Sequence, residues 1–128
     1  MNKIIVALLI IFVAADCSHE NSNKCYQGTI IMSSCCTGST FINLNTSWPL
    51  GVKTKINGTE YQNVIQVPGY LDKENTNTIY LSLRPFDRDH DQNLYPPIQC
   101  YCLMAIGLDV PVFVATAHSY TSCQQQDN

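Results

Sequence analysis

The chain has 128 residues, with seven Lys and Arg, ten Asp and Glu and a formal net charge of −3. This length suits one domain and is short for two. The sequence contains no run of Lys or Arg, which argues against a nucleic acid or an anionic membrane surface as the partner.

Residues 1–15 have the pattern of a cleaved signal peptide. A short start with one cation precedes an apolar run that ends in two small residues, Ala14-Ala15. A membrane-spanning helix needs about 20 apolar residues, so this run is too short for an anchor. We therefore expect cleavage after Ala15, with a cut after Cys17 as the alternative. Residues 16–128 are then one secreted, extracellular domain with a net charge of −4 because Lys3 is removed, and no stable membrane insertion is expected.

All seven cysteines lie beyond the expected cleavage site. In an oxidising compartment such a set predicts a disulfide framework. The six cysteines expected to form disulfides are Cys25, Cys35, Cys36, Cys100, Cys102 and Cys123. Cys17 is then an unpaired or intermolecular thiol, and in the second case it would link a homodimer. A cut after Cys17 would instead leave six cysteines in the secreted chain.

The spacing of the cysteines limits their partners. Cys35 and Cys36 are adjacent, so their side chains diverge in an extended chain and should reach two different partners. At least one of Cys100 and Cys102 should bridge to the N-terminal third, because closing so long a loop stabilises the fold by about 4 kcal/mol on the chain-entropy model. Cys123 should then fasten the C-terminal tail. Both cysteine pairs are spaced more tightly than zinc ligands, so no metal site is expected there.

Short runs rich in β-branched and aromatic residues, separated by polar turns, predict strands. These runs are residues 29–32, 40–44, 52–56, 60–67, 79–83, 98–106 and 110–117. No segment has helical periodicity, so we expect an all-β fold, a small disulfide-stabilised antiparallel β-sandwich-like domain. The last two runs predict a hairpin that carries Cys100 and Cys102 on one face of a strand.

Asn57-Gly58 lies between two of these runs and is a strong signal for a two-residue hairpin turn. Such a turn sets Ile56 opposite Thr59 and Lys55 opposite Glu60. Opposite charges then face each other across the strands, which stabilises this register by a few tenths of a kcal/mol.

Residues 84–97 form an Asp-rich segment bracketed by prolines. Its alternating oxygen-bearing side chains resemble the first half of an EF-hand calcium loop. These weak calcium candidates are Asp87, Asp89, Asp91 and Asn93. The rest of that pattern is missing, because Gln92 replaces the turn glycine and Ile98 replaces the bidentate glutamate. The sequence therefore favours a solvated acidic loop whose charge is balanced by Arg88 and His90.

Two sequons predict N-glycosylation at Asn45 and Asn57. The sequence has no catalytic motif for a serine hydrolase, a zinc protease or a phosphate-binding enzyme, so we expect neither an enzyme nor a cofactor. We expect a secreted protein that binds an extracellular protein or receptor, as a cytokine-like ligand, an inhibitor or a host-directed modulator. The alternative is a structural matrix or coat component cross-linked by disulfides.

The first prediction concerns the N-terminus of the secreted protein. Mass spectrometry of secreted material should find a chain that begins at Asp16, or at Ser18 if the alternative site is cut. Secreted protein that still carries Met1 would contradict the signal peptide.

Overall fold

The structure is a computed structural model that describes residues 24–71, 76–98, 100–102 and 109–123. The expected signal peptide, its cleavage site and Cys17 lie outside these residues. Among the described residues, no helix has the length and apolar character needed to cross a membrane.

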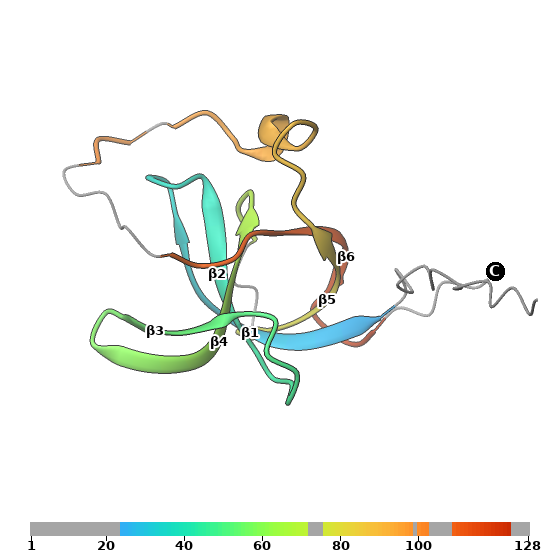
Figure 1. Ribbon diagram of the computed structural model, residues 1–128. Helices are drawn as coiled ribbons and strands as arrows, with labels where there is room; N and C mark the ends of the chain where they lie inside the picture. Colours follow the sequence, from blue (N-terminus) through green and yellow to red (C-terminus); the bar gives the residue numbers. More distant parts are fainter. Residues whose placement is uncertain (1–23, 72–75, 99, 103–108, 124–128) are drawn as a thin grey trace, which may run out of the picture.

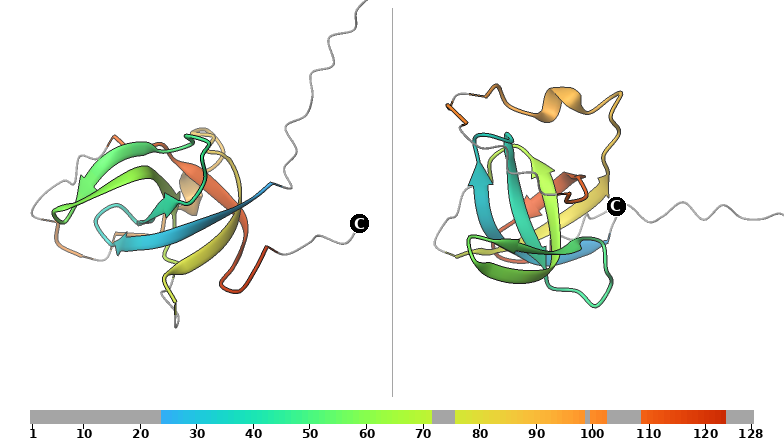
Figure 2. Two further views of the ribbon diagram at one scale, coloured as in Figure 1. Left: turned by 90° about the horizontal axis from the view of Figure 1, so that it is seen from below. Right: turned by 60° about the vertical axis from the view of Figure 1, so that its left-hand side comes forward.

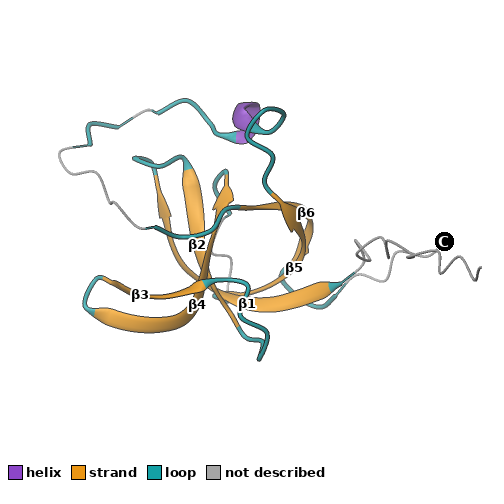
Figure 3. Cartoon of the chain, viewed as in Figure 1, coloured by secondary structure: helices purple, strands orange, loops and turns teal. Residues whose placement is uncertain are grey.

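The described residues form six strands and one short 3-10 helix (Figures 1 and 3). The elements are β1 (Cys25–Ser34), β2 (Ser39–Leu44), β3 (Val52–Ile56), β4 (Thr59–Pro68), β5 (Thr78–Pro85), η1 (Gln92–Leu94) and β6 (Phe113–Ser119). The all-β class is confirmed, and β3 has the bounds that the alternating pattern predicts.

The six strands form one sheet in the order β3-β4-β2-β1-β5-β6, and each neighbouring pair is antiparallel. The sheet curls until β6, at one edge, approaches β4, the neighbour of the other edge strand (Figure 2). Gln66 of β4 donates its N–H to the Pro111 carbonyl at 2.9 Å and bridges Val112 in parallel, just before β6. The two layers expected of a sandwich are therefore parts of one continuous sheet that wraps on itself.

The strand order β4-β2-β1-β5-β6, closed by one parallel contact, is the order found in the five-stranded Greek-key barrel called the OB-fold. In this chain β3 is an extra strand, which extends the sheet beyond β4.

The curl places one face of the sheet in the interior. The buried residues of this inner core come from β1, β2, β4 and β5 and are Ile30, Ile42, Leu44, Ile65, Val67, Ile79 and Leu81. A second cluster consists of Phe41, Ile56, Val64 and Val110. Because successive strand residues point to opposite faces, Phe41 and Ile42 fill different clusters, and so do Val64 and Ile65. Strands β2 and β4 are thus buried on both faces.

The hairpin predicted at Asn57-Gly58 is confirmed. Asn57 and Gly58 have φ angles of 50° and 85°, as the favoured turn for such a hairpin requires, and Lys55 faces Glu60 across the strands. The ion pair itself forms on the diagonal, with Lys53 Nζ at 2.9 Å from Glu60 Oε1. Both side chains are more than half exposed, so this pair contributes little to stability.

The prediction of a strand over residues 98–106 is wrong for the residues that the structure describes. The predicted hairpin between this strand and the last strand is wrong too. Ile98 and residues 100–102 lie outside any strand, and β6 pairs with β5 instead. Pro96-Pro97 precedes this segment and offers no N–H groups to a ladder. Residues 103–108 lie outside the described residues.

The second prediction concerns the close approach of Gly51 to β4. A Cβ at Gly51 would overlap the backbone carbonyl of Val64, and the Gly51 N–H donates to Asn63 Oδ1 at 2.6 Å. We expect Gly51→Ala to lower the free energy of unfolding by about 3 kcal/mol, measured by chemical denaturation, because the backbone must shift.

Gly58→Asn is the matched control. A Cβ at Gly58 meets no atom within 4 Å, and asparagine tolerates left-handed backbone, so the loss should be clearly smaller. Equal losses in the two variants would contradict the close-approach explanation.

Candidate functional site: a loop tethered by two disulfides

Three disulfides join the six described cysteines. They are Cys25–Cys123, Cys35–Cys100 and Cys36–Cys102, with Cα–Cα distances of 5.8, 6.0 and 5.5 Å. Adjacent Cys35 and Cys36 bond to different partners, as expected, and both partners lie near residue 100. Cys123 fastens the C-terminal part of the chain to the start of β1, also as expected.

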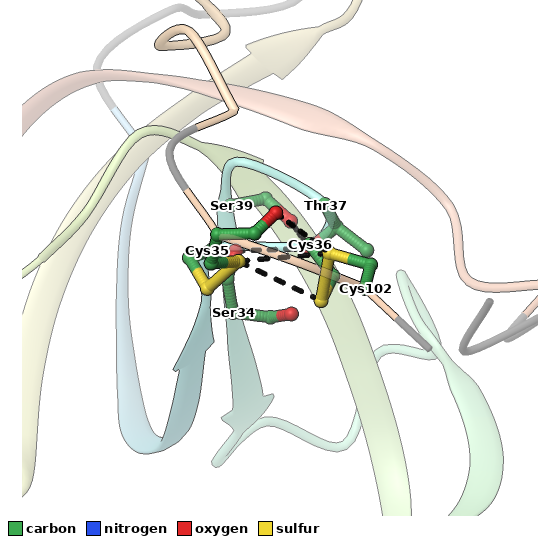
Figure 4. Close-up of a disulfide and its surroundings, with 7 residues drawn as sticks. Ser34, Cys35, Cys36, Thr37, Ser39 and Cys102 are labelled. Atoms are coloured by element: carbon green, nitrogen blue, oxygen red, sulfur yellow. Dashed lines mark hydrogen bonds between the residues drawn. A yellow bond between two sulfur atoms is a disulfide. The ribbon is translucent and has the colours of Figure 1, made fainter. Parts of the chain in front are cut away.

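Residues 86–102, of which 99 is not described, form what we call the tethered loop. The loop leaves the end of β5, arches over one end of the sheet and arrives at the β1–β2 turn (Figure 1, orange). There Cys35–Cys100 and Cys36–Cys102 join it covalently to the turn (Figure 4). The loop also packs on the turn, because a Cβ at Gly38 would lie 3.3 Å from Pro96.

The β1–β2 turn is itself held firmly by polar contacts to β4 and to the chain that follows it. Ser39 is fully buried, and its hydroxyl lies 2.6 Å from Thr37 Oγ1 and accepts a hydrogen bond from Gln66 Nε2 at 2.8 Å. The Gly69 N–H donates to the Gly38 carbonyl at 2.8 Å. The two disulfides therefore attach the loop to a rigid base.

An ion pair holds the other end of the tethered loop. Arg84, the next-to-last residue of β5, donates hydrogen bonds from its two terminal guanidinium nitrogens to the two carboxylate oxygens of Asp91 at 2.6 and 2.7 Å. The Asp87 N–H also donates to Asp91 Oδ2 at 2.8 Å. Asp91 is buried, and the hydrogen bond from Arg84 is the main cause that lowers its pKa to about 2. The same contact raises the pKa of Arg84.

Arg84 thus provides the charge that balances Asp91, where the sequence suggested Arg88 and His90. His90 contacts a different carboxylate of the loop, with its Nδ1 at 2.7 Å from Asp87 Oδ2, and both side chains are exposed.

The structure does not favour calcium at the four acidic-loop candidates. Both Asp91 oxygens are already occupied, and Asp91 is buried whereas Asp89 and Asn93 are exposed. One Asp87 oxygen accepts the Asp89 N–H at 3.0 Å. Alternate side chains therefore do not converge on one point, as a calcium loop would require.

Three cysteine sulfurs lie within 4.8 Å of one another, which is close enough to share a metal ion. They belong to Cys35, Cys36 and Cys100. All three are engaged in disulfides, and metal binding requires thiolates.

An aromatic contact joins the two ends of the segment 86–95, the first part of the tethered loop. The rings of Phe86 and Tyr95 meet edge to face, with centroids 5.6 Å apart and an interplanar angle of 68°. Burial raises the pKa of the Tyr95 hydroxyl. This contact and the Arg84–Asp91 pair give the segment a defined shape before it reaches the disulfides.

Three large side chains of the tethered loop point into solvent, and we call them the apolar crest. Leu94 is 41% exposed, Ile98 is 65% exposed and Tyr101 is fully exposed. The sequence pattern predicts a strand over residues 98–106, which includes Ile98 and Tyr101. The signal for exposure is Pro96-Pro97 just before them, together with the close spacing of Cys100 and Cys102.

A second exposed aromatic residue, Trp48, lies after the far end of β2, away from the β1–β2 turn. The ammonium of Lys24 lies 5.8 Å from the centre of its ring and 5.5 Å from that of Tyr26. Part of the ring surface is therefore engaged by the chain itself.

Comparison of the chain with known protein families gives no match, and neither does comparison with curated protein sequences.

The third prediction concerns the pH dependence of the tethered loop. The folded pKa of Asp91 is about 2, below its ordinary value of 3.8. The ion pair therefore contributes fully above about pH 4 and is lost as the pH falls through about 2. At pH 4 we expect pepsin to cut residues 86–98 of Asp91→Asn several-fold faster than the wild type. This ratio should approach one near pH 1.5, where the wild-type carboxyl is protonated too.

Asp89→Asn is the control, because Asp89 is exposed and does not contact Arg84. It should be cut at the wild-type rate at both pH values. A ratio for Asp91→Asn that does not change with pH would show that the ion pair does not hold the loop.

Proposed function

We propose that this chain is a secreted binding protein whose apolar crest docks on an extracellular protein. One observation carries the proposal: three large apolar side chains lie in solvent on a loop that is fixed at both ends. A single exposed apolar residue is ordinary on a protein surface. Three of them on one short loop that is fixed at both ends favour an interaction site more strongly, because exposed apolar side chains are unfavourable in water and a partner would cover them.

The position of Tyr101 follows from its neighbours. Cys100 and Cys102 both direct their sulfurs to the β1–β2 turn, and successive side chains of an extended chain point to opposite sides. Tyr101 is therefore held away from the turn. A ring fixed in this way loses little conformational entropy when a partner covers it, and tyrosines in such positions are frequent hot spots of interfaces.

The strand order supports, by analogy, a binding site at the tethered loop. In OB-folds, ligands bind on the second and third barrel strands and on the loops after the first and fourth. Here those loops are the β1–β2 turn and the tethered loop, and the two disulfides join them. The analogy indicates a place and not a ligand.

The glycan sites suit this arrangement. Asn45 and Asn57 are both exposed, so we propose that both sequons are used after secretion. Asn45 follows the end of β2 that lies opposite the β1–β2 turn, and Asn57 is at the tip of the β3–β4 hairpin. Glycans there would leave the apolar crest accessible.

The alternative, a cross-linked structural component, depends on Cys17, which lies outside the described residues. Within the described part, all six cysteines are paired inside the chain. Non-reducing electrophoresis of the secreted protein separates the two proposals, since a ladder of oligomers would support cross-linking and a compact monomer or dimer the binding protein.

The fourth prediction tests the apolar crest directly. Fluorescently labelled secreted protein should bind saturably to at least one cell type in a panel taken from the source of the protein and from any host. Ile98→Asp and Tyr101→Ala should each weaken this binding by tenfold or more, since a charge or a lost ring at a packed interface costs more than about 1.4 kcal/mol.

Trp48→Ala is the matched control, because Trp48 is 64% exposed and Ile98 is 65% exposed. It should bind as the wild type does. The proposal fails if no cell type binds the wild type saturably, or if the crest variants bind with unchanged affinity.

A further inference from the structure

The sulfurs of two disulfides are in contact with each other beneath the tethered loop (Figure 4). Cys36 Sγ lies 3.8 Å from Cys100 Sγ, to which it is not bonded. Cys100 Sγ in turn lies 3.6 Å from Cys102 Sγ. A thiolate released at Cys36 would therefore already touch a sulfur of the remaining disulfide.

Each of the two disulfides has one outer and one inner cysteine. Cys35 and Cys102 are exposed, whereas Cys36 and Cys100 are half-buried. A thiol in solvent can therefore approach one sulfur of each disulfide, and the inner sulfurs lie against each other.

We propose that this double disulfide is a thiol–disulfide exchange site for external thiols, either small thiols or exposed cysteines of a protein. In the first step an external thiolate attacks Cys102 Sγ. A bond forms between these two sulfurs, the Cys36–Cys102 bond breaks, and the electron pair leaves on Cys36.

In the second step the Cys36 thiolate attacks Cys100 Sγ, its contact at 3.8 Å. The Cys36–Cys100 bond forms, the Cys35–Cys100 bond breaks, and the electron pair leaves on the exposed Cys35. Protonation of Cys35 at this point leaves the external thiol bound to Cys102 as a mixed disulfide.

A third step can regenerate the external thiol. The Cys35 thiolate attacks Cys102 Sγ, forms a Cys35–Cys102 bond and expels the external thiolate. The sum of the three steps exchanges the partners of two disulfides and uses no oxidant or reductant. The loop stays tethered after it, and the proposal does not depend on what the apolar crest binds.

Two variants test the contact between the inner sulfurs, since each leaves one cysteine of the double disulfide unpaired. In Cys102→Ser the free thiol starts at Cys36, and exchange should move it to Cys35. In Cys35→Ser it starts at Cys100, and attack on Cys36 should move it to Cys102. Both variants should therefore contain the same crossed disulfide, Cys36–Cys100.

The free thiol is located by alkylation after incubation at pH 8, followed by tandem mass spectrometry. Cys123→Ser is the matched control, because it frees Cys25 at the other end of β1, away from the double disulfide. Its thiol should stay at Cys25. Thiols that remain at Cys36 and Cys100 in the two test variants would overturn the proposal.

A third arm uses the wild-type protein and so does not depend on the folding of a variant. Incubation with reduced glutathione at pH 8 should produce the Cys36–Cys100 disulfide, with glutathione on Cys102 or, after the equivalent attack on the other exposed sulfur, on Cys35, and with Cys25–Cys123 unchanged. Protein that keeps its original three disulfides, or that takes up glutathione at Cys25 or Cys123 to the same extent, would overturn the proposal.

Discussion

The structure depends on a single sheet that must bury its own apolar face. The described part contains no helix longer than η1 and no second sheet. The side chains of the inner core are therefore shielded from water only because the sheet curls around them. Burial of one Ile or Leu side chain contributes about 1.5–3 kcal/mol, and seven core residues share this gain. The closing contact between Gln66 and Pro111 then fixes the start of β6. The connection from the end of β5 at Pro85 to β6 contains the tethered loop, which crosses this end of the sheet (Figure 1).

The two disulfides beneath the loop do not contribute equally. On the chain-entropy model, the first closes about 65 residues and stabilises the fold by about 4 kcal/mol. The second then closes a ring of only a few residues and adds about 2 kcal/mol. Its clearer effect is geometric. One tether at Cys100 would let the loop pivot about a single point, whereas a second at Cys102 fixes the direction of the chain and keeps Tyr101 facing outward.

Features set by neighbouring residues could be predicted from the sequence. The Asn57-Gly58 turn fixes the register of its hairpin, and the divergence of Cys35 and Cys36 fixes that they take different partners. Features set by tertiary context could not. The apolar run that begins at Ile98 predicted a strand, because composition alone does not distinguish a strand from an extended loop that exposes its apolar residues. Asp91 pairs with Arg84 rather than with Arg88 or His90, which are closer in sequence. This pairing depends on how the loop folds back on the end of β5, which the sequence does not reveal.

The apolar crest and the exchange site meet at residues 100–102, because Tyr101 belongs to the crest and its neighbours Cys100 and Cys102 belong to the double disulfide. Tyr101 separates the sulfur-bearing residues Cys100 and Cys102 and is fully exposed. The Tyr101 ring and the Cys102 sulfur face opposite sides of this segment, so a partner that reached past the ring would also cover the approach to exposed Cys102. Docking would then protect the double disulfide from external thiols, and a thiol held at Cys102 would obstruct docking. The same short segment therefore supplies the rigidity that a binding loop needs and the reactive bonds that could change it.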